Sequence, residues 1–361
     1  MATEPLLVES GTLKLELAGA FPGLRALAWD RDVLYASRGY ELYSAEMSCR
    51  EIEWQPVARY RPQWWRNLTC RTALSFRLVR DGFHALAVLP HGNLVVAVPG
   101  AIATLPLGET EFRISHRLER GTRPLHIAAT PDGRAFWGEY FDNPSREEVH
   151  IYASLDGGLT WYVAHTFGKR SIRHVHNIVY DLWEDCLWIF TGDYGRECRI
   201  LRASLSRFLD FQVLDEVVGG NQQARAVAAV VTEGGVYFAS DTPLEQNYIY
   251  HLDRRGRVRR LSSIPSSSIY GCKNRNGIFF STMIEPSQVN HTRNVTVLGS
   301  DNGATWRPLA DWRKDRWSMK FFQYGNAFLP DGENTSDLLA VSTMAVDEAD
   351  LQTSTWRTTI S

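Results

Sequence analysis

Acidic residues recur in this sequence directly after short apolar stretches, where their side chains could carry out acid/base chemistry. Glu139, Asp193 and Asp241 are the clearest cases. Glycosidases use two carboxyl groups that flank the bond to be cleaved, one kept protonated by its surroundings and the other ionised. We therefore predict catalytic roles for these three residues, with His176 and the candidate nucleophile Tyr324 beside them. The structural alternative is that each carboxylate caps a turn.

Basic and aromatic residues near these carboxylates predict how a substrate would be held. Arginine binds carboxylates through paired hydrogen bonds, which suits Arg225 and Arg38, although Arg225 could instead pair with Asp241. A tryptophan beside an arginine is a common platform for the apolar face of a sugar ring. The predicted substrate-binding residues are Arg38, Trp65, Arg66, His126, His174, Arg196, Arg225, Glu245, Gln246 and Tyr270.

The pair His174-Val-His176 has a second interpretation. Alternate residues of a strand point the same way, so both imidazoles can reach one metal ion. With His126, and with Glu139 or Asp193, the pair would form a divalent-metal site. Such pairs also arise where one ring binds sugar hydroxyls and the other completes a core hydrogen bond. The main expectation is no cofactor, and a divalent metal ion held by His126, His174 and His176 is the alternative.

A repeated hairpin must position these residues. A short apolar strand, a turn rich in Asp, Gly or Asn, and a second strand that ends in small or polar residues recur along the chain. The spacing is roughly 45 to 55 residues for most repeats, which is the blade length of a propeller of four-stranded sheets. The hairpins cover residues 24–38, 83–99, 125–139, 174–193, 224–241, 268–283 and 323–344.

The repeat predicts an all-β fold, a seven-bladed β-propeller of four-stranded antiparallel blades, with six blades as the alternative. We expect residues 1–361 to form a single propeller domain. Residues 12–17 alternate with a period of two and could close the ring by pairing with the last blade. The beginning of the first strand and the end of the second meet at one edge of a hairpin. The candidate residues would therefore surround one face of the propeller.

Composition excludes several classes of partner. The chain has 39 Lys and Arg against 41 Asp and Glu and no long run of either sign, so we expect no nucleic-acid partner. No apolar stretch approaches the ~18 residues that span a membrane, so we expect no membrane partner. Met1–Ser10 has neither the basic nor the apolar region of a signal peptide. These features favour a cytoplasmic protein with free cysteines, or a secreted one if a leader was removed.

Two short motifs indicate a family. Residues 154–161, Ser-Leu-Asp-Gly-Gly-Leu-Thr-Trp, fit the pattern Ser-x-Asp-x-Gly-x-Thr-Trp at every defined position, and residues 301–306 repeat it without the leading Ser. In such a turn the Asp caps backbone N–H groups, Gly adopts a positive φ and Trp packs between sheets. This is the Asp box, or BNR repeat, and the chain resembles the sialidase-like Asp-box β-propeller superfamily. The resemblance implies a propeller fold and a carbohydrate ligand.

Three functions follow from the residues and the resemblance. The main expectation is a glycoside hydrolase that acts on the terminus of a glycan in a pocket on the channel face. One alternative is a metal-dependent polysaccharide lyase acting on a uronic acid, by analogy with propeller-shaped oligogalacturonate lyases. The other is a non-catalytic glycan-binding propeller, since the superfamily contains such members. In every case the expected partner is a glycan or oligosaccharide, and the oligomeric state is left open.

Overall fold

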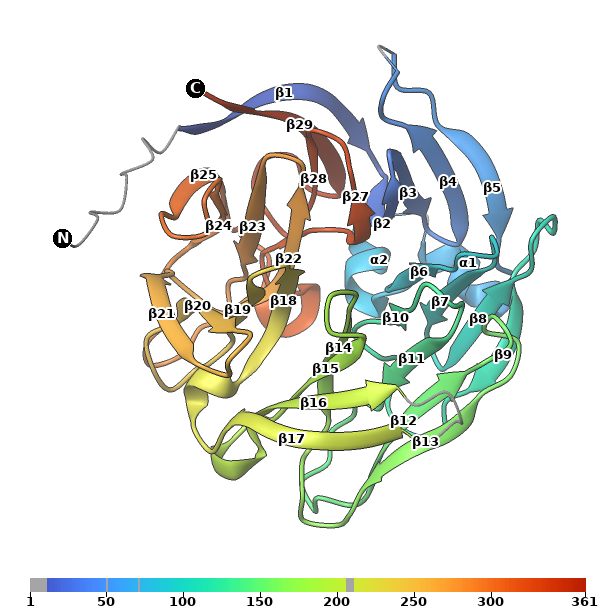
Figure 1. Cartoon of the computed structure of the whole chain (residues 1–361). Helices are drawn as coiled ribbons and strands as arrows, with labels where there is room; N and C mark the ends of the chain where they lie inside the picture. Colours follow the sequence, from blue (N-terminus) through green and yellow to red (C-terminus); the bar gives the residue numbers. More distant parts are fainter. Residues whose placement is uncertain (1–11, 50, 71, 206–210) are drawn as a thin grey trace.

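Seven β-sheets are arranged as blades around a central axis, which confirms the predicted all-β, seven-bladed propeller (Figure 1). The computed structural model describes residues 12–49, 51–70, 72–205 and 211–361. Met1–Ser10, on which the expected absence of a signal peptide depends, lies outside the described residues. Each predicted hairpin supplies two neighbouring strands of one blade, and the six-bladed alternative is wrong.

In blades 2 to 6 four antiparallel strands follow the chain from the innermost to the outermost position. Blade 2 contains β6 (Leu86–Val88), β7 (Leu94–Val98), β8 (Ala101–Leu105) and β9 (Arg113–Arg117). Blade 3 contains β10 (Ala128–Ala129), β11 (Ala135–Gly138), β12 (Val149–Ser154) and β13 (Tyr162–Phe167). Blade 4 contains β14 (Val175–Asp181), β15 (Cys186–Thr191), β16 (Arg199–Leu205) and β17 (Phe211–Gly219).

Blades 5 and 6 complete this series. Blade 5 contains β18 (Ala226–Thr232), β19 (Gly235–Ser240), β20 (Tyr248–Asp253) and β21 (Val258–Ser263). Blade 6 contains β22 (Ser268–Asn274), β23 (Gly277–Thr282), β24 (Asn294–Ser300) and β25 (Arg307–Arg313). Two short 3₁₀ helices, η1 (Gly195–Glu197) and η2 (Gln222–Ala224), lie in the loops of blade 4 and before blade 5.

Segments from both ends of the described chain close the ring. Blade 7 has the order β1-β29-β28-β26, in which β1 (Leu13–Pro22) pairs antiparallel with β29 (Gln352–Ile360), as predicted. Its inner strands are β28 (Leu338–Met344) and β26 (Asn326–Phe328). Blade 1 contains β2 (Arg25–Arg31), β3 (Val33–Arg38), β4 (Glu41–Glu46) and β5 (Gln55–Arg59). The segment β27 (Asp331–Asn334) joins blade 1 in parallel beside β2, which brings Asp331 to the centre.

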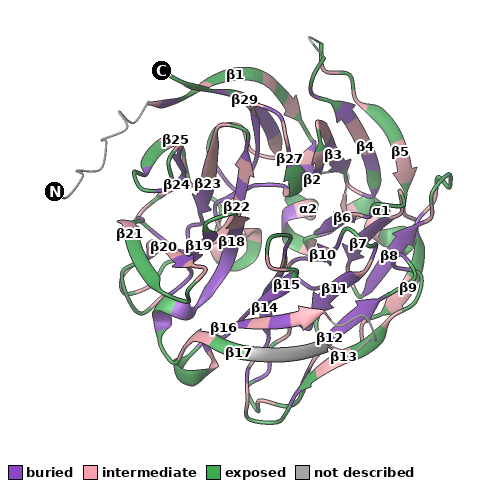
Figure 2. Ribbon diagram, viewed as in Figure 1, coloured by how far each residue is buried: buried purple, intermediate pink, exposed green. Residues whose placement is uncertain are grey.

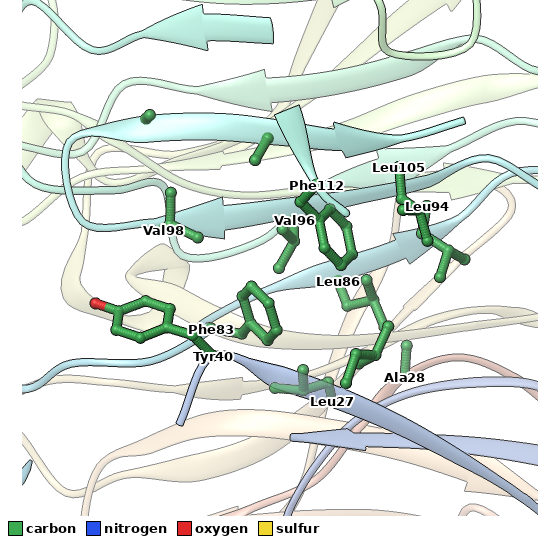
Figure 3. Packing of buried hydrophobic residues seen from close by; sticks show 13 residues of the cluster. Leu27, Ala28, Tyr40, Phe83, Leu86, Leu94, Val96, Val98, Leu105 and Phe112 are labelled. Atoms are coloured by element: carbon green, nitrogen blue, oxygen red, sulfur yellow. The ribbon is translucent and has the colours of Figure 1, made fainter. Parts of the chain in front are cut away.

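The hydrophobic core lies between neighbouring blades. Leu27 of β2 packs with Leu86, Val96 and Phe83 of blade 2 in one such cluster (Figure 3). Each buried aliphatic or aromatic side chain contributes about 1.5–3 kcal/mol. The inner strands are buried, whereas the outer strands β5, β21 and β25 expose much of their length (Figure 2).

The Asp-box turns join the two outer strands of blades 3 and 6, as predicted. Asp156 Oδ1 accepts hydrogen bonds from the N–H groups of Leu159 (3.1 Å) and Thr160 (2.9 Å). Gly157 and Gly158 have φ values of 75° and 84°. Trp161 reaches blade 2 and donates to Ser115 Oγ over 3.0 Å, so the motif joins two blades.

The second box differs from the sequence alignment. Asn302, and not Asp301, accepts from the N–H groups of Ala304 (2.8 Å) and Thr305 (2.9 Å). The hydroxyl of Ser300 lies 3.3 Å from Asn302 Oδ1, so Ser300 is the leading serine of this turn. This turn, from Ser300 to Trp306, is one residue shorter than the first copy, from Ser154 to Trp161. An alignment without a gap therefore matched Asp301 to Asp156, although Asn302 takes its place.

Three short helices lie on one face of the ring. They are α1 (Trp64–Thr69), α2 (Ala73–Val79) and α3 (Met319–Phe322), and α2 lies close to the centre (Figure 1). The buried guanidinium of Arg77 donates to Phe322 O over 2.8 Å and to Asp315. This links α2 to the segment before blade 7. None of the described helices is long and apolar enough to cross a membrane.

Irregular pairing occurs at the beginning of four innermost strands. The register shifts within residues 26–28 of β2, 175–177 of β14, 226–229 of β18 and 268–270 of β22. A β-bulge bends a strand and redirects the side chains beside it, and bulges are frequent next to binding sites. The bulges therefore modify the same face that the sequence predicts to carry the site.

Candidate functional site

His174 and His176 point toward each other at the start of β14. Their Nε2 atoms lie 3.0 Å apart, and both rings are buried. His174 Nδ1 lies 3.0 Å from Phe141 O, and His176 Nδ1 lies 3.1 Å from Ala226 O. Because a carbonyl oxygen only accepts hydrogen bonds, each Nδ1 must carry the proton. Both Nε2 atoms of the neutral rings then offer lone pairs to the same small space.

Asp193 completes this group from the loop after β15. Its Oδ1 lies 3.4 Å from His174 Nε2 and 3.3 Å from His176 Nε2. Its Oδ2 lies 3.1 Å from Arg173 Nη1. Burial alone would raise the pKa of Asp193, but a proton on the facing histidine nitrogens, which donates to the carboxylate and attracts its charge, outweighs burial and holds that pKa well below its usual value. Asp193 is therefore an ionised carboxylate.

A second carboxylate lies across Arg225 from this group. Arg225 Nη2 is 3.5 Å from Asp193 Oδ1 and 3.6 Å from Asp241 Oδ2. Burial raises the pKa of Asp241 to about 7, with Arg225 opposing the shift and Glu285 adding to it. Burial also raises the pKa of Glu285. The site thus holds one carboxylate whose pKa is lowered and two whose pKa values are raised.

Tyr140 packs against the histidine pair with its ring tilted to both imidazoles. Its ring centroid is 4.3 Å from that of His174 and 6.2 Å from that of His176. Burial, followed by the nearby charges of Asp241 and Asp193, raises the pKa of Tyr140. Its hydroxyl therefore stays protonated at neutral pH and can donate a hydrogen bond.

Backbone contacts hold the loop that carries Asp193. Gln222 of η2 donates from Nε2 to Asp193 O over 3.0 Å, and Thr242 donates to Gln222 Oε1 over 2.7 Å. Arg225 also donates to Asp193 O over 3.4 Å. Blades 4 and 5 thus fix the position of the carboxylate together.

The structure groups some of the predicted residues and separates others. His174, His176, Asp193, Arg225 and Asp241 lie together. The carboxylate of Glu139 lies apart, because it pairs with Arg120 and accepts from the His150 N–H over 2.8 Å. His126 also lies outside the histidine pair, since its Nδ1 is 3.0 Å from Asp331 Oδ2. Asp193, rather than His126, is therefore the third potential metal ligand.

The remaining predicted residues have contacts other than the histidine pair. Tyr270 is near His126, with ring centroids 6.3 Å apart, and Tyr324 is half-buried before β26. Arg38 donates to Pro22 O over 3.4 Å, while Arg66 pairs with Asp81 and stacks on Trp65. Arg196, in the loop of blade 4, and Glu245 and Gln246, in the loop of blade 5, are exposed.

Sequence reasoning did not identify Tyr140 or Arg173 as site residues. Tyr140 follows the candidate Glu139 and Arg173 precedes the candidate His174, so their place beside these residues could have identified them. Asp331 was also missed, because nothing local indicates that β27 lies beside β2.

Comparisons with known proteins show the architecture. No protein-family model and no curated protein matches the sequence. A chain of the mitotic checkpoint complex matches with a TM-score of 0.56 and 11% identity, over 99% of this chain and 95% of that one. The β-propeller domain of Cps50 (Swd1) from Myceliophteria thermophila gives 0.56 and 10%, over 96% and 100%. The WD40 β-propeller domain of Doa1 gives 0.53 and 12%, over 96% and 97%.

Identities this low relate the folds and carry no information on activity. None of these matches supports the sialidase-like superfamily specifically, and the Asp-box resemblance has no further support from them. The chain is similar in fold to β-propellers of the WD40 type.

Proposed function

We propose that this propeller binds a divalent metal ion through His174, His176 and Asp193 and acts on an acidic sugar beside it. The observation that carries the proposal is the convergence of three lone-pair donors in a buried site. Two neutral imidazoles and one carboxylate are a common ligand set for zinc and other divalent transition metals.

The hydrogen bonds behind the histidines support a metal ion over a simple polar cluster. A histidine ligand usually donates its other ring N–H to a carbonyl or carboxylate, which fixes the ring and its tautomer. His174 and His176 do so to Phe141 O and Ala226 O. Without a cation between them, the two Nε2 lone pairs would face each other at 3.0 Å.

The surrounding side chains suit a uronic acid, the substrate of the lyase alternative. A bound divalent ion would offset the charge of the substrate carboxylate and so ease removal of the neighbouring proton, which Asp241, with a pKa raised to about 7, would accept. Arg225 is a charged donor that can hold that carboxylate. The Tyr140 hydroxyl stays protonated and can donate to a leaving oxygen.

Metal dependence provides the test. The protein is treated with EDTA, reloaded separately with Mn²⁺, Zn²⁺ or Ca²⁺, and incubated with uronate oligosaccharides while ultraviolet absorbance of an unsaturated product is recorded. We expect activity only in a reloaded sample, and its loss in His174→Ala and His176→Ala. His91→Ala, an exposed histidine, should behave like the wild type. Failure of all three metals to bind, measured by calorimetry, would overturn the proposal.

A glycoside hydrolase, the main expectation from the sequence, is the second candidate. Its support is the pair Asp193 and Asp241, which flank Arg225 and whose pKa values are displaced in opposite directions. Such a divergence is typical of an acid and a base that work on one bond. This function predicts turnover of aryl glycosides that EDTA does not affect and that Asp241→Asn abolishes.

A non-catalytic binding propeller is the third candidate, and the fold that the chain shares with WD40 propellers is compatible with it. For this function, a glycan array would show binding while neither substrate panel is turned over. Substitution of Asp241 would then leave glycan binding largely intact.

A further inference from the structure

Two arginines at the centre of the ring lack the carboxylate partners that other enclosed arginines have. Arg77 pairs with Asp315, Arg254 with Asp181, and Arg120 with Glu139. Among the described residues, no carboxylate lies within ion-pair distance of Arg25 or Arg123. Both are partly buried, and arginine is permanently charged, so two such guanidiniums without counter-charges are costly unless an anion joins them.

The contacts of Arg25 leave much of its hydrogen-bonding capacity unused. Its Nη atoms reach the carbonyl oxygens of Phe83 and His84 only at 3.4 Å, which is long for a hydrogen bond. Its Nε is buried without a partner. The guanidinium carbon lies 4.1 Å from the centre of the Phe328 ring, which fixes its plane.

Arg123 adds a second positive charge, and His84 lies beside both arginines as a neutral ring. Arg123 donates from Nη1 to Arg80 O over 2.9 Å, a neutral partner. Burial, and then the charge of Arg25, lowers the pKa of Arg123 to about 10. Burial, followed by Arg123 and Arg25, lowers the pKa of His84 well below its usual value, and its Nδ1 has no partner.

The nearest acidic group is already in use. Asp331 of β27 lies 3.0 Å from His126 Nδ1, and Tyr270 is a neutral phenol whose pKa burial raises further. The cluster therefore contains two guanidinium groups and one carboxylate. That carboxylate, Asp331, is already paired with His126.

A cavity of about 230 Å³ reaches Arg25, but not Arg123, from the side of α2. Its lining includes Arg38, Phe83, Phe328 and Phe76 of α2. Sites for drug-sized molecules occupy about 300–1,000 Å³, so this space suits a small ligand with one charged end.

We propose that Arg25 and Arg123 form a binding site for a small polyatomic anion, a phosphate or carboxylate group, on the blade 1 side of the channel. Planar guanidiniums recognise both groups through paired, charge-assisted hydrogen bonds. The protein residues involved are distinct from His174, His176 and Asp193, so the site does not depend on the proposed metal ion. If the metal site and the anion site both exist, a ligand that enters the channel should carry an acidic group.

Thermal unfolding tests the site with defined anions. The wild type, Arg25→Met and Arg123→Met are stripped of metal with EDTA, dialysed free of the chelator and heated at constant ionic strength set with NaCl, with inorganic phosphate, glucose 6-phosphate or galacturonate added. We expect at least one anion to raise the wild-type Tm and bind with a Kd that each substitution weakens at least tenfold. In chloride alone both variants should melt at or above the wild-type Tm, because each removes an unpaired charge.

Arg113→Met is the matched control, since Arg113 is exposed on β9 and pairs with Glu109. It should retain the full anion response. A response to both phosphates assigns phosphate as the source, and a response to galacturonate alone assigns a sugar carboxylate. Anion-dependent shifts of equal size in wild type, Arg25→Met and Arg123→Met, or no shift with any anion, would overturn the proposal. Since metal has been removed from every sample, neither result depends on the metal site.

Discussion

His174 Nε2 lies 3.0 Å from His176 Nε2, while the opposite nitrogen of each ring lies against a backbone carbonyl. While both rings are neutral, this arrangement places two hydrogen-bond acceptors in contact and directs both at Asp193. The bulge in β14 makes it possible, because Val175 pairs with Thr191 and Asn177 with Phe190, which leaves His176 outside the ladder.

A metal ion bound to this pair should stabilise the fold. Ligand binding to the native state alone adds about 2.7 kcal/mol at a free concentration one hundred times Kd. We expect urea unfolding of the wild type to shift by about this amount with the preferred metal. His174→Ala should remove the shift. An equal shift in that variant would place the metal elsewhere.

The corrected register of the second Asp box predicts an asymmetry between neighbours. Asn302→Ala removes the acceptor for two backbone N–H groups, so we expect it to destabilise the protein by about 1–2 kcal/mol. Asp301→Ala should change stability by less than about 0.5 kcal/mol. Chemical denaturation of both variants measures the difference. A larger loss for Asp301 would restore the original alignment.

Asp81 anchors the segment that carries α1 and α2. Its buried carboxylate accepts from Tyr40 over 2.9 Å and also binds Arg66 and Thr69. Asp81→Asn leaves the Arg66 cation without its partner, which costs about 3 kcal/mol in buried pairs and less here because Arg66 is partly exposed. We expect faster proteolysis within residues 61–80. Arg61→Met, at an exposed pair with Glu111, should not accelerate it.

His84 predicts a dependence of stability on pH. Burial, then Arg123 and Arg25, lowers its folded pKa well below that of the unfolded chain, ~6.5. Stability from this group is complete above that value and falls as the pH decreases, because the unfolded state binds the proton more readily. The slope is about 1.4 kcal/mol per pH unit. His84→Gln should flatten the decline between pH 6.5 and 5 in denaturation experiments. An unchanged slope would contradict the assignment.

The repeat could be predicted because period-two strands and glycine-rich turns are local features. Seven hairpins identified the blades and the face on which His174, Asp193, Arg225 and Asp241 meet. Adjacent residues of a strand point to opposite sides, but the sequence does not say which one faces the centre. That is why Glu139 was chosen although Tyr140 contacts the histidine pair.

Contacts between distant segments could not be predicted. Asp331 reaches the centre because β27 joins β2 in parallel, a pairing that no neighbouring residue signals. The unpaired state of Arg25 and Arg123 is likewise a property of the assembled ring. Whether an arginine has a partner depends on blades that are far apart in the sequence.

Because Leu13 pairs with Ile360, the ring cannot close until its last strand, β29, is available. During synthesis β1 emerges first and must wait until β29 is available, while each intermediate blade can fold on its neighbour. An incomplete chain would therefore expose the edge of β28 and the unpaired β1, both open to pairing with another molecule. Once β29 has paired with β1 and β28, the ring is closed, and the edges that made the incomplete chain prone to aggregation are covered.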